Sequence, residues 1–160
     1  MSEQSWIRTL LPQRYPLLLV DRVVSLVPEL SICALKAVTV NEPCYAGMGD
    51  GAAPADYAYP VSLMLESLGQ TAALLWLRGQ EPAATASVLL FAGVRDYRVE
   101  GGAFPGDVLR HHVEIERVVA ETAFARGETW IGDRRVAQVD TLIAARRPRA
   151  DLAGRAARPT

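Results

Sequence analysis

The sequence has little cysteine and little net charge of either sign, and each shortage excludes a class of protein; the shortage of lysine we attribute to genomic base composition. Lys36 is the single lysine among 17 basic residues, and 18 acidic residues leave a net charge of −1. No overall positive field therefore favours nucleic acid or a membrane surface as a partner. Cys33 and Cys44 lack the close spacing of metal clusters, so we expect no metal, no disulfide framework and a reducing cytoplasm.

The sequence also has no long apolar run and no leader pattern. Its N-terminus lacks the basic segment and apolar stretch of a signal peptide. The most apolar stretch, Val61–Leu77, contains Glu66 and Gln70. Seventeen residues with two polar groups inside favour a buried core helix over a membrane helix.

The composition is that of one globular domain, with 50% hydrophobic and 22% charged residues among 160. We predict a single domain over residues 1–145. Residues 146–160 hold five Arg and one Asp, and we expect this basic tail to be disordered. The segment Gly47–Tyr59 is rich in Gly and Ala and predicts a long loop.

The pattern of apolar residues predicts an α+β fold with one long helix. After a short N-terminal helix, two strands form a hairpin, a helix follows, and four more strands complete the chain. The expected hairpin strands are Leu17–Val27 and Ser31–Val40, the expected helix is Pro60–Arg78, and the later strands are Ser87–Val99, Asp107–Val119, Glu121–Ile131 and Arg134–Ala145. Because the helix is apolar nearly all round, we expect a curved antiparallel sheet around it and a second subunit at the sheet edge.

Glu66 is the residue most in need of an explanation, because its neighbours on this helix are apolar. A carboxylate there must find donors, lose its charge or line a cavity. Ser62, Glu66 and Gln70 recur every fourth residue and form one polar stripe. An inert polar seam between subunits is the alternative, but we favour a functional carboxylate. Free N–H groups after Pro60 could polarise a carbonyl oxygen.

Four motifs in the right order resemble one family. LPQRYPLLLVDRV, from Leu11, is similar to Leu-Pro-His-Arg-Tyr-Pro-Phe-Leu-Leu-Val-Asp-Arg-Val, which opens the small hot-dog-fold 3-hydroxyacyl-(acyl-carrier-protein) dehydratases. VNEPCYAG, YPVSLMLESLGQ and FAGVRDYRVEGGAFPGDVLR resemble later motifs of that family. The resemblance spans residues 11–145 and implies a dimeric hot-dog fold.

The resemblance also implies a composite site between two subunits. A His of one subunit takes the α-proton of a 3-hydroxyacyl thioester, and a Glu on the other subunit's helix protonates the leaving hydroxyl. Glu66 matches that acid and Gln70 the helix Gln, while Phe91, Ala92 and Gly93 match the strand beside the phosphopantetheine arm. The implied substrate is carried by an acyl carrier protein, and no cofactor is implied.

Three site positions depart from the family pattern. Gln13 stands at the position that we assign to the catalytic His, and an amide cannot act as a general base. Val61 replaces the Gly at the helix start, where it would crowd the thioester beside Ser62. Met48 stands at the His of the family's His-Phe-Pro-Gly loop, and the segment from there to Pro60 is about four residues longer.

Other candidate residues carry weaker signals. His111 and His112 are adjacent on an expected strand, so at most one faces the helix, and we expect a structural or solvated His. The glycines of the long loop lack the context of a phosphate-binding motif. Arg95, Arg98 and Arg110 could meet an acidic carrier protein, although scattered strand arginines commonly form a solvated face.

The sequence therefore leaves three functions open. The leading hypothesis is a heterodimer with a His-bearing paralogue, in which Glu66 completes the partner's site and Gln13 faces the partner's acid in a dead site. Such an enzyme would serve fatty-acid or polyketide assembly. The alternatives are a hot-dog thioesterase that uses Glu66, and a subunit, homodimeric or heterodimeric, that only binds acyl chains or the carrier.

Overall fold

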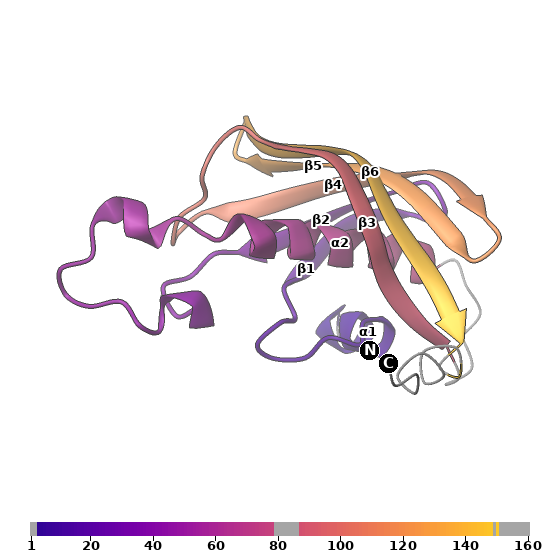
Figure 1. Cartoon of the computed structure of the whole chain (residues 1–160), viewed down its shortest axis with the longest axis horizontal. Coiled ribbons are helices and arrows are strands. Elements are labelled where there is room, and N and C mark those ends of the chain that lie inside the picture. The colour runs from indigo at the N-terminus through magenta and orange to yellow at the C-terminus, as the bar shows by residue number, and fades with distance from the viewer. Residues whose placement is uncertain (1–2, 79–86, 149, 151–160) are drawn as a thin grey trace, which may run out of the picture.

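A computed structural model describes residues 3–78, 87–148 and 150. The elements, in chain order, are α1 (Glu3–Leu10), β1 (Arg22–Val27), β2 (Ser31–Ala37), the 3-10 turns η1 (Pro43–Tyr45) and η2 (Pro54–Tyr57), α2 (Val61–Arg78), β3 (Ser87–Val99), β4 (Val108–Val119), β5 (Thr122–Ile131) and β6 (Arg134–Pro148). The predicted α+β architecture with one long helix is confirmed (Figure 1).

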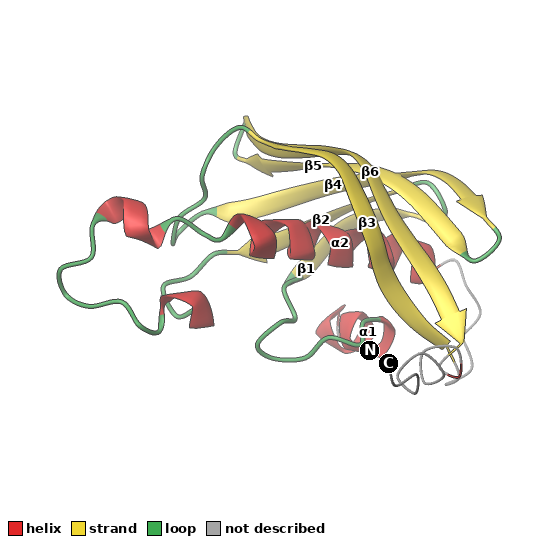
Figure 2. Cartoon of the chain, viewed as in Figure 1, coloured by secondary structure: helices red, strands yellow, loops and turns green. Residues whose placement is uncertain are grey.

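The six strands form one antiparallel sheet in the order β1-β2-β4-β5-β6-β3. The sheet curves around α2, which contacts β2, β4, β5 and β6 (Figure 2). Leu68, Leu74 and Leu75 of α2 are fully buried in the main core, and Ile7 of α1 packs into the same core. The helix is therefore enclosed on most sides, as its apolar sequence requires.

Gly127 allows α2 to lie close to the sheet. A Cβ built at Gly127 would lie 3.1 Å from Cδ1 of Leu68 and 3.3 Å from the backbone oxygen of His112. The strand pairing also shifts register between Ala125 and Gly127, which bends β5. A side chain at this position would push the helix away from the sheet.

Five of the six predicted strands differ at one end from the observed ones. The second ends at Ala37 and not at Val40, and the strands that start at Val108 and Thr122 each begin one residue later than expected. The first strand begins at Arg22 and not at Leu17, because the backbone of Leu17 and Leu19 bonds to the Gln70 side chain on α2 instead of a neighbouring strand. The last strand runs to Pro148, so the first residues of the predicted tail belong to the sheet. Residues 151–160 of that tail, and the predicted helix end at Gly79, lie outside the described residues.

The predicted long loop is observed between β2 and α2. We call residues 43–59 the arm, because in Figure 1 they extend away from the sheet and carry both 3-10 turns. At its base, Tyr45 and Tyr59 are buried, and Met48 packs against the same cluster. Further along, a Cβ built at Gly49 or Gly51 would meet no atom within 4 Å. These glycines at the tip of the arm therefore have open space around them.

Candidate active site

The middle of α2 brings a carboxylate and two amides together. Glu66 is half-buried, and its Oε1 accepts hydrogen bonds from Nε2 of Gln70 at 2.9 Å and from Nε2 of Gln13 at 3.3 Å. No hydrogen bond to Oε2 of Glu66 is recorded among the described residues. The predicted stripe thus places Glu66 beside donors, and one of its oxygens is left for another partner.

Backbone groups fix the orientation of the Gln70 amide. Gln70 is 2% exposed, its Oε1 accepts from the N–H of Leu19 at 2.9 Å, and its Nε2 also donates to the carbonyl of Leu17 at 2.7 Å. Since an amide that flipped would lose both bonds, Gln70 always presents an N–H to Glu66. The segment that follows α1 is attached to α2 by the same contacts.

Gln13 is positioned by the end of α1. The guanidinium of Arg14 donates to the carbonyls of Arg8, Leu11 and Gln13 at 3.1, 2.7 and 2.6 Å, and so closes the C-terminus of α1. The Gln13 side chain then reaches Glu66, and its own Oε1 is buried with no hydrogen-bond partner among the described residues.

This contact corrects one expectation. Gln13 was expected to face the acid of a partner subunit, but its amide contacts Glu66 of its own chain. The α1 segment packs along the chain's own α2, since Ile7 and Leu11 are buried in the core with Leu74 and Leu75. Residue 13 is therefore not the residue that crosses to the other subunit's acid.

The helix start has the exposure expected of a binding surface. Val61 is 47% exposed and Ser62 is also exposed. The N–H groups of Leu63 and Met64 both donate to the carbonyl of Pro60, at 3.0 and 3.1 Å. Among the described residues no bond is recorded for the N–H groups of Val61 and Ser62, which leaves two donors at the start of α2.

Strand β3 is one edge of the sheet and lies beside the helix. The Phe91 ring is 48% exposed and lies about 3.4 Å from where a Cβ of Gly69 would stand. A register shift between Phe91 and Gly93 leaves Ala92 outside the regular pairing with β6. Of the six residues predicted for substrate binding, the three expected beside the phosphopantetheine arm therefore occupy an irregular, accessible edge near the helix that carries Glu66.

The two histidines lie on opposite faces of β4, as their adjacency predicts. His111 is fully buried, with Nε2 2.8 Å from Oγ of Ser67 and Nδ1 3.0 Å from Oγ1 of Thr129. Because the Ser67 hydroxyl donates to the carbonyl of Met64, it accepts from Nε2–H of His111, and Nδ1 accepts from Thr129. Burial lowers the pKa of His111 to about 3. It is a satisfied, neutral core residue.

His112 points to the outer face of the sheet. It is exposed, and its Nε2 lies 3.9 Å from Sγ of the cross-strand Cys33. Desolvation, followed by the charge of Arg110, lowers the pKa of His112, and burial raises the pKa of the Cys33 thiol. Neither histidine contacts Glu66, so the described part of this chain supplies no imidazole base to that carboxylate.

A hollow of about 480 Å³ lies on the outer face of the sheet, away from Glu66. Its polar side chains come from β4, β5 and β6: His112, Glu114, Glu116, Arg126, Glu128, Gln138 and Asp140. Three of its carboxylates pair with arginines, at 2.5 Å for Glu114–Arg126, 2.7 Å for Asp140–Arg98 and 2.9 Å for Glu128–Arg135. We interpret it as a solvated, ion-paired sheet face.

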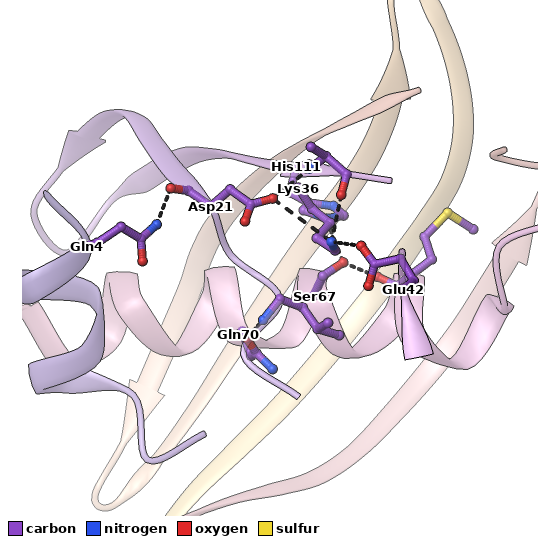
Figure 3. Close-up of polar contacts among 10 residues, drawn as sticks. Gln4, Asp21, Lys36, Glu42, Ser67, Gln70 and His111 are labelled. Carbon is purple, nitrogen blue, oxygen red and sulfur yellow. Dashed lines mark hydrogen bonds and ion pairs between the residues drawn. The ribbon is translucent and has the colours of Figure 1, made fainter. Parts of the chain in front are cut away.

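The sequence analysis missed a buried ion pair at the base of the arm. Lys36 is 5% exposed, forms a short ion pair with Glu42, donates to the carbonyl of Ala37 at 2.6 Å and lies 4.0 Å from Asp21 (Figure 3). The ammonium also lies 6.0 Å from the ring centre of Tyr59, at the other end of the arm. The lone lysine on an apolar strand was the available signal.

Two kinds of feature are absent from the described residues. They contain no group of three or more His, Cys, Asp or Glu side chains placed to hold a metal ion. None of their helices is both long enough and apolar enough to cross a membrane.

Comparisons with known proteins identify the family. A family model described as FabA-like domain matches residues 11–140. A 3-hydroxyacyl-(acyl-carrier-protein) dehydratase FabZ of Burkholderia thailandensis is 43% identical over 140 residues, covering 87% of this chain and 80% of that protein. This chain belongs to the FabA-like dehydratase family. A FabZ of Dechloromonas aromatica is 37% identical over 137 residues, covering 85% of this chain and 92% of that protein.

Solved structures place this FabA-like chain in the hot-dog fold, as predicted. A chain from "The Dehydratase Heterocomplex ApeI:P from Xenorhabdus doucetiae" superposes with a TM-score of 0.77 at 15% identity, covering 95% of this chain and 97% of that chain. A hot-dog-like protein from Thermanaerovibrio acidaminovorans superposes with a TM-score of 0.60 at 14% identity, covering 82% and 90%. At these identities the likeness shows the fold alone.

Proposed function

We propose that this chain is a subunit of a 3-hydroxyacyl-(acyl-carrier-protein) dehydratase, in which Glu66 acts as general acid and a partner subunit supplies the base. The observation that carries the proposal is the environment of Glu66. Two neutral amides anchor one of its oxygens, and among the described residues the other oxygen has no recorded partner and no histidine contacts the carboxyl group. The chain thus offers an acid without a base, in a family whose curated relatives are FabZ dehydratases.

The chemistry divides between two groups. The partner's His takes the proton from C2 of the 3-hydroxyacyl thioester, and the electron pair forms the C2–C3 double bond as the C3–O bond breaks. Glu66 gives its proton to the departing hydroxyl, which leaves as water. The free N–H groups of Val61 and Ser62 would hold the thioester oxygen, on which negative charge develops. The products are an unsaturated thioester and water.

The partner's base must enter from a segment that crosses between subunits, and the arm is the candidate. Gln13 contacts its own Glu66, so position 13 does not cross. The arm extends from the sheet and holds Met48, at the loop position where the resembling family has a His. We infer that the arm of a His-bearing paralogue reaches Glu66. A homodimer of this chain would present methionine at both sites and would be inactive or weak.

The remaining site residues would hold the carrier arm. The edge strand β3 exposes Phe91, Val94 and Val99, at 48%, 40% and 43%. An apolar edge of this kind favours pairing with a second hot-dog subunit.

Ala92 and Gly93, in the register shift of that strand, would line the path of the phosphopantetheine, whereas the buried Gln70 would act by holding Glu66. The likeness to a chain from a dehydratase heterocomplex supports a mixed dimer.

The test is a mixed dimer with a His-bearing paralogue, obtained by co-expression and assayed for dehydration of a 3-hydroxyacyl carrier-protein thioester. Glu66→Gln keeps the size and hydrogen bonding of the side chain but removes the transferable proton. We expect it to lower the rate by about two to four orders of magnitude. The matched control is Glu116→Gln on the outer sheet face, which should leave the rate unchanged.

The other hypotheses are outcomes of the same experiment. If Glu66→Gln leaves the dehydration rate unchanged, this chain serves its partner as a binding or scaffold subunit. If the isolated chain releases free thiol from acyl-pantetheine, and Glu66→Gln stops that release, the chain is a thioesterase. If the pure homodimer dehydrated the substrate at a rate close to that of the family's enzymes, the need for a partner's His would be contradicted.

A further inference from the structure

The two amides on Glu66 bind the same carboxyl oxygen, and this determines where a proton can sit. Oε1 accepts from Gln70 at 2.9 Å and from Gln13 at 3.3 Å. A carboxyl oxygen has two lone pairs in its plane, so two N–H donors occupy both of them. When Glu66 is protonated, the proton must therefore reside on Oε2, the oxygen that no recorded partner holds.

The two amides are not equivalent. Gln70 is locked by the backbone of Leu17 and Leu19 and would keep its place without Glu66. Gln13 has no such support, because within the described part of the chain its side chain has one recorded hydrogen bond, the bond to Glu66. In the structure Gln13 turns its nitrogen toward Glu66 and leaves its oxygen on the other side.

That orientation is unfavourable for folding. Among the described residues the buried Gln13 oxygen has no hydrogen-bond partner, and a buried acceptor that has lost its hydrogen bonds to water lowers stability. A methionine of similar length would avoid this cost. Methionine could not, however, donate a hydrogen bond to Glu66.

From these contacts we propose that Gln13 is a positioning residue for Glu66: together with Gln70 it saturates Oε1 and so directs the transferable proton to Oε2. The inference rests on the proposed function, in which Glu66 is the acid. Loss of the Gln13 donor frees one lone pair of Oε1, so that the proton can reside on the oxygen facing away from the leaving hydroxyl. The Glu66 carboxyl group, then held only by its hydrogen bond from Gln70, also rotates more freely.

The test combines rate and stability of Gln13→Met in the mixed dimer with a His-bearing paralogue. We expect kcat to fall about tenfold, the loss of one donor to a reacting carboxyl, while KM stays within about twofold. The melting temperature of the variant should be equal to or above that of the original chain, because an unsatisfied acceptor is removed with the bond. Gln13→His, which restores an N–H donor, should recover most of kcat. Gln138→Met on the outer face is the matched control.

Two results would overturn the inference. An unchanged kcat in Gln13→Met would show that Gln70 alone orients the acid. A melting temperature that falls along with the activity, without recovery by Gln13→His, would show a structural role.

A readout that needs no catalysis separates this inference from the proposed function. In the chain labelled with carbon-13 at glutamate Cδ, the Glu66 signal is the one lost in Glu66→Gln. It should shift in Gln13→Met, return toward its place in Gln13→His and stay unmoved in Gln138→Met. If this shift is seen and the mixed dimer still fails to dehydrate, the proposed function fails alone. If the dimer dehydrates and the signal does not shift, the positioning role fails alone.

Discussion

His111 makes a strong prediction about stability in acid. Its ring is fully buried between β4, β5 and α2, and burial lowers its pKa from the ordinary 6.5 to about 3. The unfolded chain binds a proton at this ring below about pH 6.5, while the folded chain does not. Stability from this residue is therefore complete above pH 6.5, falls as the pH drops through that value, and stops falling near pH 3.

The magnitude follows from the width of that window. Between pH 7.5 and 5.0 the unfolded ring becomes almost fully protonated, and each unit below 6.5 costs about 1.4 kcal/mol, so His111 should remove about 2 kcal/mol of unfolding free energy. The Ser67 hydroxyl donates to Met64 and accepts from Nε2–H, so an added proton would sit on Nδ1, the nitrogen that accepts from Thr129. The protonated ring would lose its bond from Thr129.

Urea unfolding followed by tryptophan fluorescence, at one protein concentration and at both pH values, measures this difference. In His111→Gln the loss between pH 7.5 and 5.0 should be about 2 kcal/mol smaller than in the original chain. His112→Gln is the control, since its exposed ring should contribute much less. A His111→Gln variant with the full acid loss would refute the reasoning, as would His111 ring signals in NMR that titrate near pH 6.5 in the folded protein.

Two further substitutions test the packing that positions the site. Lys36→Met leaves Glu42 buried without its cation and should cost about 3–5 kcal/mol in urea unfolding, with part of that loss recovered when Glu42→Gln is added. Gly127→Ala forces a Cβ to 3.1 Å from Leu68 and should cost about 1–3 kcal/mol, whereas Gly69→Ala, which meets only the Phe91 ring at 3.4 Å in the middle of a helix, should not destabilise the chain. Equal stabilities in either pair would contradict the contacts described.

The sequence predicts the elements well where one physical pattern dominates. The all-round apolar stretch of α2 has no alternative to a covered helix, and its expected range differs from the observed one by the single residue Pro60. Strand β3 was predicted with both ends correct. The first strand was predicted too long because a side chain did compete: Gln70 takes the backbone bonds of Leu17 and Leu19. The spacing of apolar residues along a strand cannot predict a hydrogen bond to an amide more than 50 residues away.

In the candidate site, too, the local contact was predictable from the sequence and the long-range contact was not. Glu66 and Gln70 were predictable because a spacing of four residues on a helix is a local geometric fact, and the structure brings them to 2.9 Å. The contact between Gln13 and Glu66 joins residues 53 positions apart, and it depends on how α1 packs along α2. The resemblance supplied a role for position 13 but not the subunit whose acid it meets. That assignment changes the meaning of Gln13. In an inactive site, substitution of Gln13 would leave the rate unchanged. Beside Glu66 of its own chain, Gln13 belongs to the site that this Glu66 serves, so its substitution should change the rate of that site.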